Sequence, residues 1–209
     1  MEIIFQLVVL IFSIMIHEIS HGAVAFYLGD DTAKRLGRLT LNPLVHLDPV
    51  GSVLLPLLLA LPRLFGIPTI VVGWAKPVPY DPRNLKNPKT GAGLIALAGP
   101  ASNLLIAVVF AVLLKLAIVF ELAFGLTVAF QIIIFINLLL AIFNLIPIPP
   151  MDGSKILFAL LPDRYYRVQE FLERNSLILI LAFLFFGLNY LGRLIALLNL
   201  LLFRLLGVL

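Results

Sequence analysis

The chain has 209 residues, of which 62% are hydrophobic and 12% are charged. Soluble domains average about 45–50% apolar and about 25% charged residues, so this composition excludes an ordinary soluble domain and indicates a protein of the lipid bilayer. It contains no cysteine, which excludes disulfides and thiolate metal sites. The formal net charge is +4, but no basic stretch interleaved with aromatic residues indicates a nucleic-acid partner.

The first apolar segment, residues 3–28, is long enough to cross a bilayer, which takes about 20 helical residues. Gly29-Asp30-Asp31 follows it as a helix-ending signal. No lysine or arginine precedes the apolar run, and the sequence H-E-I-S-H interrupts it. We therefore expect a helix that is retained in the protein rather than a cleaved signal peptide.

The segment between the first and second predicted spans is polar or broken by proline. Residues 36–47 alternate apolar and polar positions, which predicts short β-strands at the membrane edge. Residues 50–70 are apolar, but Pro56, Pro62, Pro68 and Arg63 divide them into pieces too short to cross comfortably. Residues 73–89 contain four prolines, four cations and a Trp/Tyr pair, which is typical of an interfacial loop.

Two further apolar segments, residues 91–119 and 125–146, each predict a membrane-spanning helix. The first half of the former is rich in glycine and alanine, so it can approach another helix closely. Pro-Ile-Pro-Pro ends the latter, and a polar, helical stretch follows to residue 175. Residues 176–207 contain two short apolar runs, which favour either a tight helical hairpin or one broken span.

These elements predict an all-α polytopic membrane protein. It would have about five transmembrane helices, a proline-broken re-entrant or sixth segment, and short membrane-edge β-strands. We expect a single integral-membrane domain over residues 1–209, with a core at about 3–160 and a C-terminal helical hairpin at about 176–207.

Residues 17–21, H-E-I-S-H, place two imidazoles four positions apart and hence on one face of the first helix. His17 and His21 can then bind one zinc ion, while Glu18 reaches a water on the metal. The alternative is a set of polar side chains without a role. Ionisable groups midway along a transmembrane helix are costly and normally face a protein interior or a wet cavity, so the metal site is the better interpretation.

A zinc site needs a third protein ligand, and no histidine follows His21 at the spacing known from soluble zinc proteases. Asp152 follows the proline run that ends the third clear span, and it is the best candidate. Asp48 is a rival that could form a second site with His46. An Asp-Pro turn at the membrane interface is the better interpretation of Asp48.

Three asparagines lie within or at the end of the predicted spans. Asn137 and Asn144 are seven residues apart, which is two helical turns, and therefore share one face. Such amides could hydrogen-bond a substrate backbone or stabilise an oxyanion. Alternatively they hydrogen-bond from helix to helix, and Asn103 in G-P-A-S-N has the same two interpretations.

Three motifs resemble the site-2 protease family of intramembrane zinc metalloproteases. H-E-I-S-H at 17–21 is similar to the family's helix-borne metal pair and base, and G-P-A-S-N at 99–103 to its small-residue helix motif. N-L-I-P-I-P-P-M-D-G at 144–153 is similar to its third-ligand motif. The loop G-W-A-K-P-V-P-Y at 73–80 resembles one in the smaller members. The resemblance covers roughly residues 5–160 and leaves the last spans outside it.

The resemblance implies a zinc-dependent endopeptidase, with one Zn²⁺ per chain, that cuts transmembrane protein substrates within or near the bilayer. The implied site residues are His17, His21 and Asp152 for the metal, Glu18 as the catalytic base, Asn144 at the substrate or oxyanion, and Asn103 as support for the site. We expect a small member without a PDZ-like insertion or a soluble C-terminal tail. Its control would come from a membrane protein that the sequence does not identify, or would be absent.

A substrate helix hides its peptide bonds in i to i−4 hydrogen bonds, so it must unwind before it can be cut. We expect the strands predicted at 36–47 to offer the unwound segment an edge for β-augmentation. Two alternatives from other classes are a membrane transporter and a catalytically silent membrane scaffold. A transporter usually shows repeated halves, which this sequence lacks, and a scaffold would have lost a ligand or the base.

The distribution of cations predicts the topology. If residues 50–70 dip into the bilayer and return, thirteen of the fifteen Lys and Arg residues lie on one side, and only Lys115 and Arg193 lie opposite. The positive-inside rule favours this arrangement over a crossing segment, which splits the cations ten to five. It predicts an external N-terminus, a cytoplasmic Lys34–Lys89 region and a zinc site in the cytoplasmic half of the bilayer.

Overall fold

The computed structural model describes residues 2–66, 76–205 and 207; residues 67–75, with Pro68 and Trp74 of the sequence predictions, lie outside this description. The described part is helical and contains no β-strand. Four helices in it are long and apolar enough to cross a membrane: Ile3–Tyr27, Pro88–Val119, Phe124–Asn144 and Ser176–Leu205. The chain is an integral membrane protein, and the prediction of about five spans exceeds the four found among the described residues.

Short helices connect the spans. Between the first and second are α2 (Thr32–Arg35), α3 (Pro43–His46), the π-helical turn η1 (Pro49–Leu54), α4 (Leu55–Ala60), and the 3₁₀ turns η2 (Leu61–Phe65) and η3 (Pro82–Asn84). After the third are α7 (Asp152–Leu160), the 3₁₀ turn η4 (Asp163–Tyr165) and α8 (Tyr166–Arg174). The last span consists of α9 (Ser176–Ala182), the π-helical turn η5 (Phe183–Gly187) and α10 (Leu188–Leu205).

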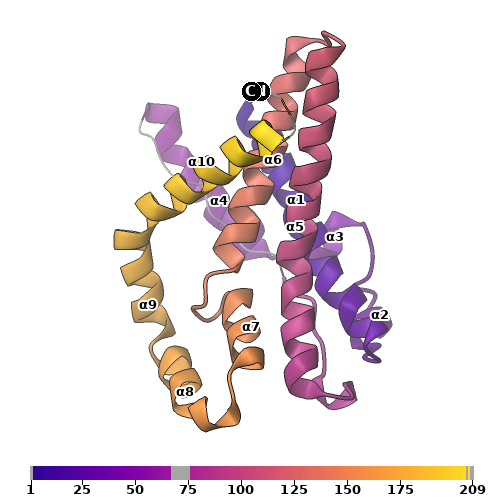
Figure 1. Ribbon diagram of the computed structural model, residues 1–209, viewed down its shortest axis with the longest axis vertical. Helices are drawn as coiled ribbons and strands as arrows, with labels where there is room; N and C mark the ends of the chain where they lie inside the picture. Colours follow the sequence, from indigo (N-terminus) through magenta and orange to yellow (C-terminus); the bar gives the residue numbers. More distant parts are fainter. Residues whose placement is uncertain (1, 67–75, 206, 208–209) are drawn as a thin grey trace.

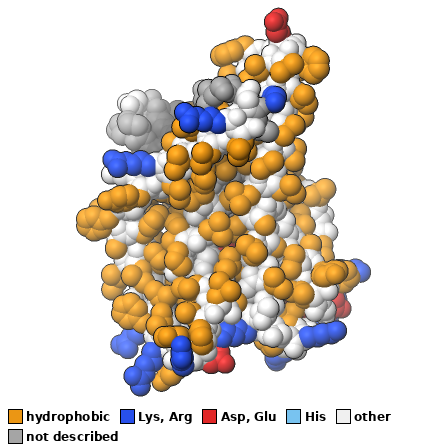
Figure 2. Space-filling view, viewed as in Figure 1, with side chains coloured by type: hydrophobic (Ala, Val, Ile, Leu, Met, Phe, Trp, Pro, Cys, Tyr) orange, Lys and Arg blue, Asp and Glu red, His pale blue; other side chains and the backbone are white. Residues whose placement is uncertain are grey.

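The centre of the fold is α5 (Pro88–Val119), which runs antiparallel to α1 (Glu2–Tyr27) and α6 (Phe124–Asn144) and packs against both (Figure 1). Ala107 and Ala111 lie one turn apart on α5 and are fully covered, so the neighbouring helix approaches closely. The outer surface of the bundle is largely hydrophobic (Figure 2), as expected for helices that face lipid.

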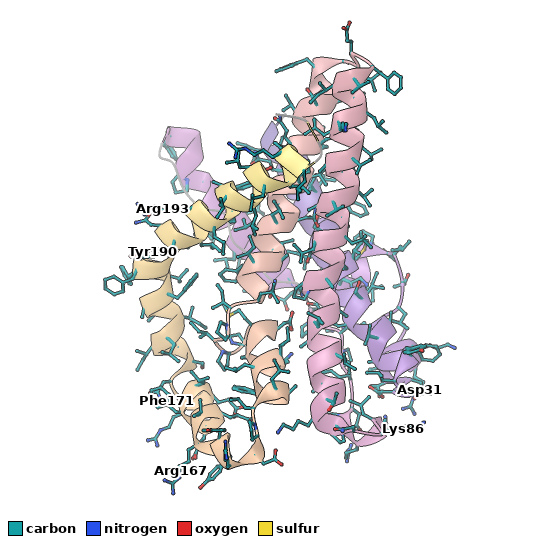
Figure 3. All side chains as sticks on the ribbon, viewed as in Figure 1. Asp31, Lys86, Arg167, Phe171, Tyr190 and Arg193 are labelled. Carbon is teal, nitrogen blue, oxygen red and sulfur yellow. The ribbon has the colours of Figure 1, made fainter. Side chains whose placement is uncertain are left out.

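A buried network fixes the end of α1 to the loop before α5. Asp30 is fully buried and accepts hydrogen bonds from the hydroxyl of Thr32, the amide of Asn84 and the backbone N–H of Asp81. Burial opposes the ionisation of Asp30, but these hydrogen bonds outweigh it and lower its pKa. The network therefore holds two loops that are distant in the sequence at one end of the bundle, as the labels on Asp31 and Lys86 in Figure 3 show.

The prediction of β-strands at 36–47 is wrong. This segment is a turn and bends followed by the short helix α3. Asn42 caps α3 by accepting a hydrogen bond from the backbone N–H of Leu44, and Pro43 takes the first helical position, where its missing N–H costs nothing. Because these local bonds satisfy the backbone without a partner strand, the segment offers no edge for the predicted β-augmentation.

The described residues on the two sides of the proline-broken segment lie next to each other. The described part, up to residue 66, consists of η1, α4 and η2. Beyond the gap, the backbone N–H of Lys76 donates to the carbonyl of His46 over 2.9 Å. Asp48 caps η1 by accepting from the backbone N–H groups of Val50 and Gly51, so the turn interpretation of Asp48 is the better one.

The last 30 described helical residues form one continuous, bent helix rather than a hairpin. The break predicted around residues 187–192 is helical, and α10 turns across the upper part of the bundle (Figure 1). This turn lets Leu191 and Ile195 bury against α5 and α6. The end of α10 reaches the end of α5, where a Cβ on Gly207 would lie 3.8 Å from the Nζ of Lys115.

Candidate metal centre

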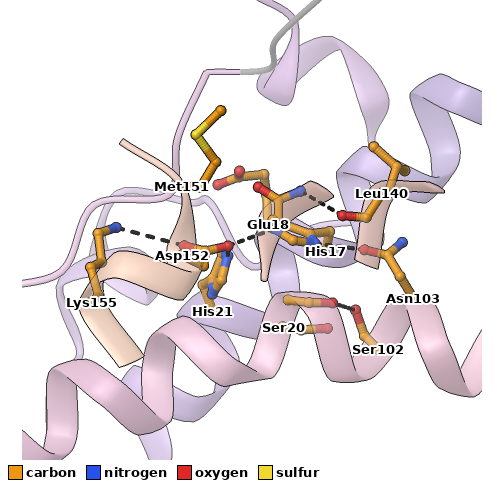
Figure 4. A network of polar contacts seen from close by, with 12 residues as sticks. His17, Glu18, Ser20, His21, Ser102, Asn103, Leu140, Met151, Asp152 and Lys155 are labelled. Carbon is orange, nitrogen blue, oxygen red and sulfur yellow. Dashed lines mark hydrogen bonds and ion pairs between the residues drawn. The ribbon is translucent and has the colours of Figure 1, made fainter. Parts of the chain in front are cut away.

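The two histidines of α1 and the first residue of α7 converge between the helices (Figure 4). The Nε2 atoms of His17 and His21 each lie 3.1 Å from the Oδ2 of Asp152. All three side chains are buried, and their ligand atoms lie within 4.8 Å of one another. In the described part of the chain this is the one group of His, Asp and Glu side chains close enough to share an ion.

The other ring nitrogen of each histidine has a protein partner. The Nδ1 of His21 lies 2.6 Å from the carbonyl oxygen of Ile95, which can only accept, so Nδ1 carries the proton. The Nδ1 of His17 lies 2.6 Å from the Oδ1 of Asn103, whose amide nitrogen already donates elsewhere. Both Nε2 lone pairs are therefore left for a metal, and both rings are fixed in orientation.

Gly99 on α5 makes room for the histidine pair. A Cβ on this residue would lie 2.5 Å from the Nε2 of His17 and 2.5 Å from the Nε2 of His21. Any side chain would therefore displace the ligands. The expectation that the small-residue half of this span permits close approach is confirmed here.

The end of α6 and the start of α7 deliver Asp152 to the site. A Cβ on Gly153 would collide with the backbone of Leu145, so glycine allows this tight return. The Oδ2 of Asp152 faces the histidines, while its Oδ1 lies 3.7 Å from the Nζ of Lys155. Sequence reasoning missed Lys155, although its spacing of three from Asp152 places it on the same side of a helix.

Glu18 lies beside the histidines and is held by a loop. Its Oε2 accepts a hydrogen bond of 2.9 Å from the backbone N–H of Val78. Val78 is buried, and Gly22 leaves room for it, since a Cβ on Gly22 would lie 2.8 Å from the Val78 side chain. Val78 belongs to the segment 73–89 that was predicted as an interfacial loop, but its contact with Glu18 has no signal in the sequence.

Asn103 and Asn137 lie behind His17 and are both fully buried. The amide of Asn103 donates to the Oδ1 of Asn137 over 2.9 Å, and the amide of Asn137 donates to the hydroxyl of Ser13 over 3.0 Å. These bonds join α5, α6 and α1, which agrees with the second interpretation of these asparagines, hydrogen bonding between helices. Because neither side chain is exposed, neither asparagine can contact a substrate in this arrangement.

Asn144, the last residue of α6, is in a different environment. It is partly exposed, and its amide donates to the carbonyl of Leu140 in its own helix over 2.9 Å. His46 is not joined to the metal group either: its Nε2 donates to the Thr40 carbonyl over 2.9 Å, and its Nδ1 is buried without a partner. Asp48 and His46 are not part of any group of three or more such ligands among the described residues.

The donor set fits zinc. Two imidazole nitrogens and one carboxylate oxygen are ligands that zinc takes, and three protein ligands leave a position open for water or substrate. Ligand atoms about 2.0–2.2 Å from a tetrahedral ion lie about 3.3 Å apart. The two Nε2 to Oδ2 distances of 3.1 Å are close to that separation.

A helical membrane protein with a buried His₂Asp centre is thus the class that fold and site define. The profile of Peptidase family M50 matches residues 117–188. The chain is 43% identical to "Putative zinc metalloprotease YwhC" of Bacillus subtilis, over 76% of this chain and 69% of that protein. It is 32% identical to "Putative zinc metalloprotease Rip2" of Mycolicibacterium smegmatis, over 68% of this chain and about half, 51%, of that protein. No solved structure matches the chain. This chain belongs to peptidase family M50.

Proposed function

We propose that the protein is a zinc-dependent intramembrane endopeptidase that hydrolyses peptide bonds within or near the transmembrane segments of membrane proteins. The observation that carries this proposal is the meeting of His17, His21 and Asp152 next to Glu18, inside a bundle of apolar helices. Ionisable groups at such a depth are costly and mark functional sites. The names of the relatives from Bacillus and Mycolicibacterium support the same chemistry.

The ligands would hold Zn²⁺ through the two Nε2 atoms and the Oδ2 of Asp152. Zinc, when bound, supplies a Lewis acid that polarises a carbonyl and makes water a better nucleophile. Glu18 takes the proton of the attacking water and returns it to the leaving nitrogen. The N–H of Val78 fixes one oxygen of Glu18 and leaves the other for this proton.

The three asparagines divide into two roles. Asn144 sits at the open end of α6, so its amide can turn from the Leu140 carbonyl to a substrate carbonyl or an oxyanion. Asn103 and Asn137 support the site behind His17, because their hydrogen bonds connect this histidine of α1 to α5 and α6.

The two alternatives are less well supported. A catalytically silent scaffold has no need of a complete ligand set with a base beside it, and a transporter usually has inverted or parallel repeats that this chain does not show. A silent scaffold also does not explain why both Nε2 atoms are left for a metal.

We further propose an external N-terminus, a cytoplasmic Lys34–Lys89 region and a zinc site in the cytoplasmic half of the bilayer. The hydrogen bond from Lys76 to His46 supports it, because the broken segment cannot leave on one face and emerge on the other with its ends joined. Lys and Arg side chains gather at the end of the bundle that holds α2, η3 and α8 (Figure 2). His17 and His21 lie ten and six residues before Tyr27, or about 15 and 9 Å from that end, so the ligands lie between the middle of a core of about 30 Å and this face.

The variant Glu18→Gln tests the proposal. Because this residue is assigned to proton transfer, the variant should keep its zinc while cleavage falls by about 10²–10⁴. Asp152→Ala should lose both zinc and cleavage. Zinc content is measured on the purified variants, and cleavage as single-span fragments that appear in membranes with the active enzyme only. A Glu18→Gln protein that cleaves normally, or that loses its zinc at unchanged helicity, contradicts the assignment.

A further inference from the structure

Lys155 is a charged residue beside the metal ligands that the proposed mechanism does not use. It lies on α7 three residues after Asp152 and therefore on the same side of that helix. Its Nζ lies 3.7 Å from the Oδ1 of Asp152, a distance that suits an ion pair but is too long for a direct hydrogen bond. Figure 4 shows Lys155 and the histidines on opposite sides of this carboxylate.

The two oxygens of the Asp152 carboxylate have separate partners. The Oδ2 lies 3.1 Å from the Nε2 of each histidine, and the Oδ1 faces Lys155. Among the described residues, Lys155 is the one cation paired with this Oδ1. A carboxylate whose two oxygens are equally free can offer one or both of them to a metal ion. The ammonium group of Lys155 therefore favours the arrangement in which only the Oδ2 is offered.

Lys155 lines a hollow of about 670 Å³ between the start of α5, α7 and α8. Its side chain is 45% exposed, whereas that of Asp152 is 9% exposed, so a hydrated ammonium group acts on a buried carboxylate. Lys89 lines the same hollow, but its Nζ lies 2.5 Å from both the carbonyl of Leu161 and the Oδ1 of Asp163. Of these two lysines, only Lys155 is paired with a metal ligand.

We propose that Lys155 is a positioning residue, whose positive charge holds the Oδ1 of Asp152 away from the histidines so that Asp152 offers the metal one oxygen. The inference rests on the proposed function and adds a residue to it. A third ligand that takes a single position leaves the open position of a catalytic zinc site for water or substrate. A lysine can do this as a point charge on a flexible stem, which needs no fixed hydrogen-bond geometry.

Lys155→Met tests the inference, with Lys89→Met as the matched control in the same hollow. The purified chain in detergent is loaded with Zn²⁺, or with Co²⁺, whose visible absorption weakens when its coordination number rises from four to five. Lys155→Met should weaken this absorption, because both oxygens of Asp152 can then turn to the metal. Its zinc dissociation constant should stay equal or fall, because a positive charge near the cation is removed.

Cleavage of a single-span substrate by Lys155→Met should fall about 10- to 100-fold in kcat, with little change in KM, the range for loss of a residue that orients a metal ligand. Lys89→Met should match the native chain in spectrum, zinc affinity and kcat. Lys155→Arg should restore all three, since a guanidinium also pairs with a carboxylate oxygen. Circular dichroism checks the fold of each variant, and Lys155→Ala provides a second uncharged variant.

Three results would overturn the inference: a native Co²⁺ spectrum in the uncharged variants, loss of zinc from these variants when they are folded, or a change confined to KM. The second would assign Lys155 to metal affinity, and the third to substrate binding. The spectrum is read without substrate. A changed spectrum in a chain that never cleaves any span therefore refutes the proposed function alone, whereas a native spectrum in an active chain refutes only the role of Lys155.

Discussion

Each histidine of the centre uses its two ring nitrogens for different purposes. One nitrogen faces Asp152, and the other is held by the side chain of Asn103 or the carbonyl of Ile95. Such bonds select the ring tautomer that can bind a metal and restrict the rotation of the ring. The affinity of the centre for zinc therefore depends on residues that would not touch the metal.

Asn103→Ala should raise the zinc dissociation constant by about 10- to 100-fold, because His17 loses the acceptor for its Nδ1 proton. Asn103→Asp keeps an acceptor oxygen and should lose less. Competition with a chromogenic chelator measures the constant, and circular dichroism checks the fold. Unaltered zinc affinity in a folded Asn103→Ala protein would contradict the role given to this residue.

Asn144→Ala should leave zinc binding unchanged and slow cleavage by about 10²–10³, the value for loss of one oxyanion donor. The amide of Asn144 has no bond to the metal ligands, which is why the two effects separate. Cleavage rates of a purified single-span substrate provide the measurement. Equal losses of thermal stability and activity would instead assign Asn144 to helix packing.

At the scale of the elements, the spacing of α1 and α5 decides whether the centre can form. Gly99 faces both Nε2 atoms. In the second half of α5, Ala107 and Ala111 are buried against the neighbouring helices. Glycine and alanine at such positions allow backbones to approach without leaving cavities. The metal centre is thus a product of helix packing as much as of its ligands.

Gly99→Ala should weaken zinc binding and destabilise the fold by about 1–3 kcal/mol, since its methyl group must displace one histidine or push α5 away. Gly125→Ala is the matched control, because a Cβ there meets no atom within 4 Å. Thermal unfolding in detergent, followed by circular dichroism, gives the two midpoints. Equal midpoints and equal zinc contents for both variants would refute the packing argument.

At the scale of the whole molecule, the loops at both ends of the broken segment belong to one end of the bundle. The buried Asp30 network and the bond between Lys76 and His46 hold them there. Lys115 lies at the other end of α5, close to the end of α10. Both loops must therefore lie on the same side of the membrane, and Lys115 must lie on the opposite side.

Single cysteines at Lys34, Lys86 and Lys115 test this arrangement, because the native chain has no cysteine. An impermeant maleimide added to intact cells should label Lys115→Cys only, while Lys34→Cys and Lys86→Cys react after the membrane is opened. Zinc content of each variant serves as the check on folding. Labelling of positions 34 and 86 from opposite faces would show that the broken segment crosses the bilayer.

The sequence alone determined the features whose physical cause is local. The length and apolarity of α1, α5 and α6, the end of α1 at a glycine with φ 108°, and the shared face of His17 and His21 all follow from a few consecutive residues. The prediction from the sequence was wrong where the same pattern of apolar and polar residues is compatible with two kinds of local structure. Alternation at 36–47 suggested strands, yet the cap at Asn42 and the lack of a partner strand give a short helix.

Only the tertiary structure decided which distant groups meet. His17 and Asp152 are 135 positions apart, and their contact depends on how α5 and α7 pack. The sequence offered both Asp48 and Asp152 as ligands, and packing brings only Asp152 to the histidines among the described residues. The contact of Val78 with Glu18 and the bend before α10 are of the same kind. Such contacts arise from the burial of complementary surfaces, for which no short stretch of sequence carries a signal.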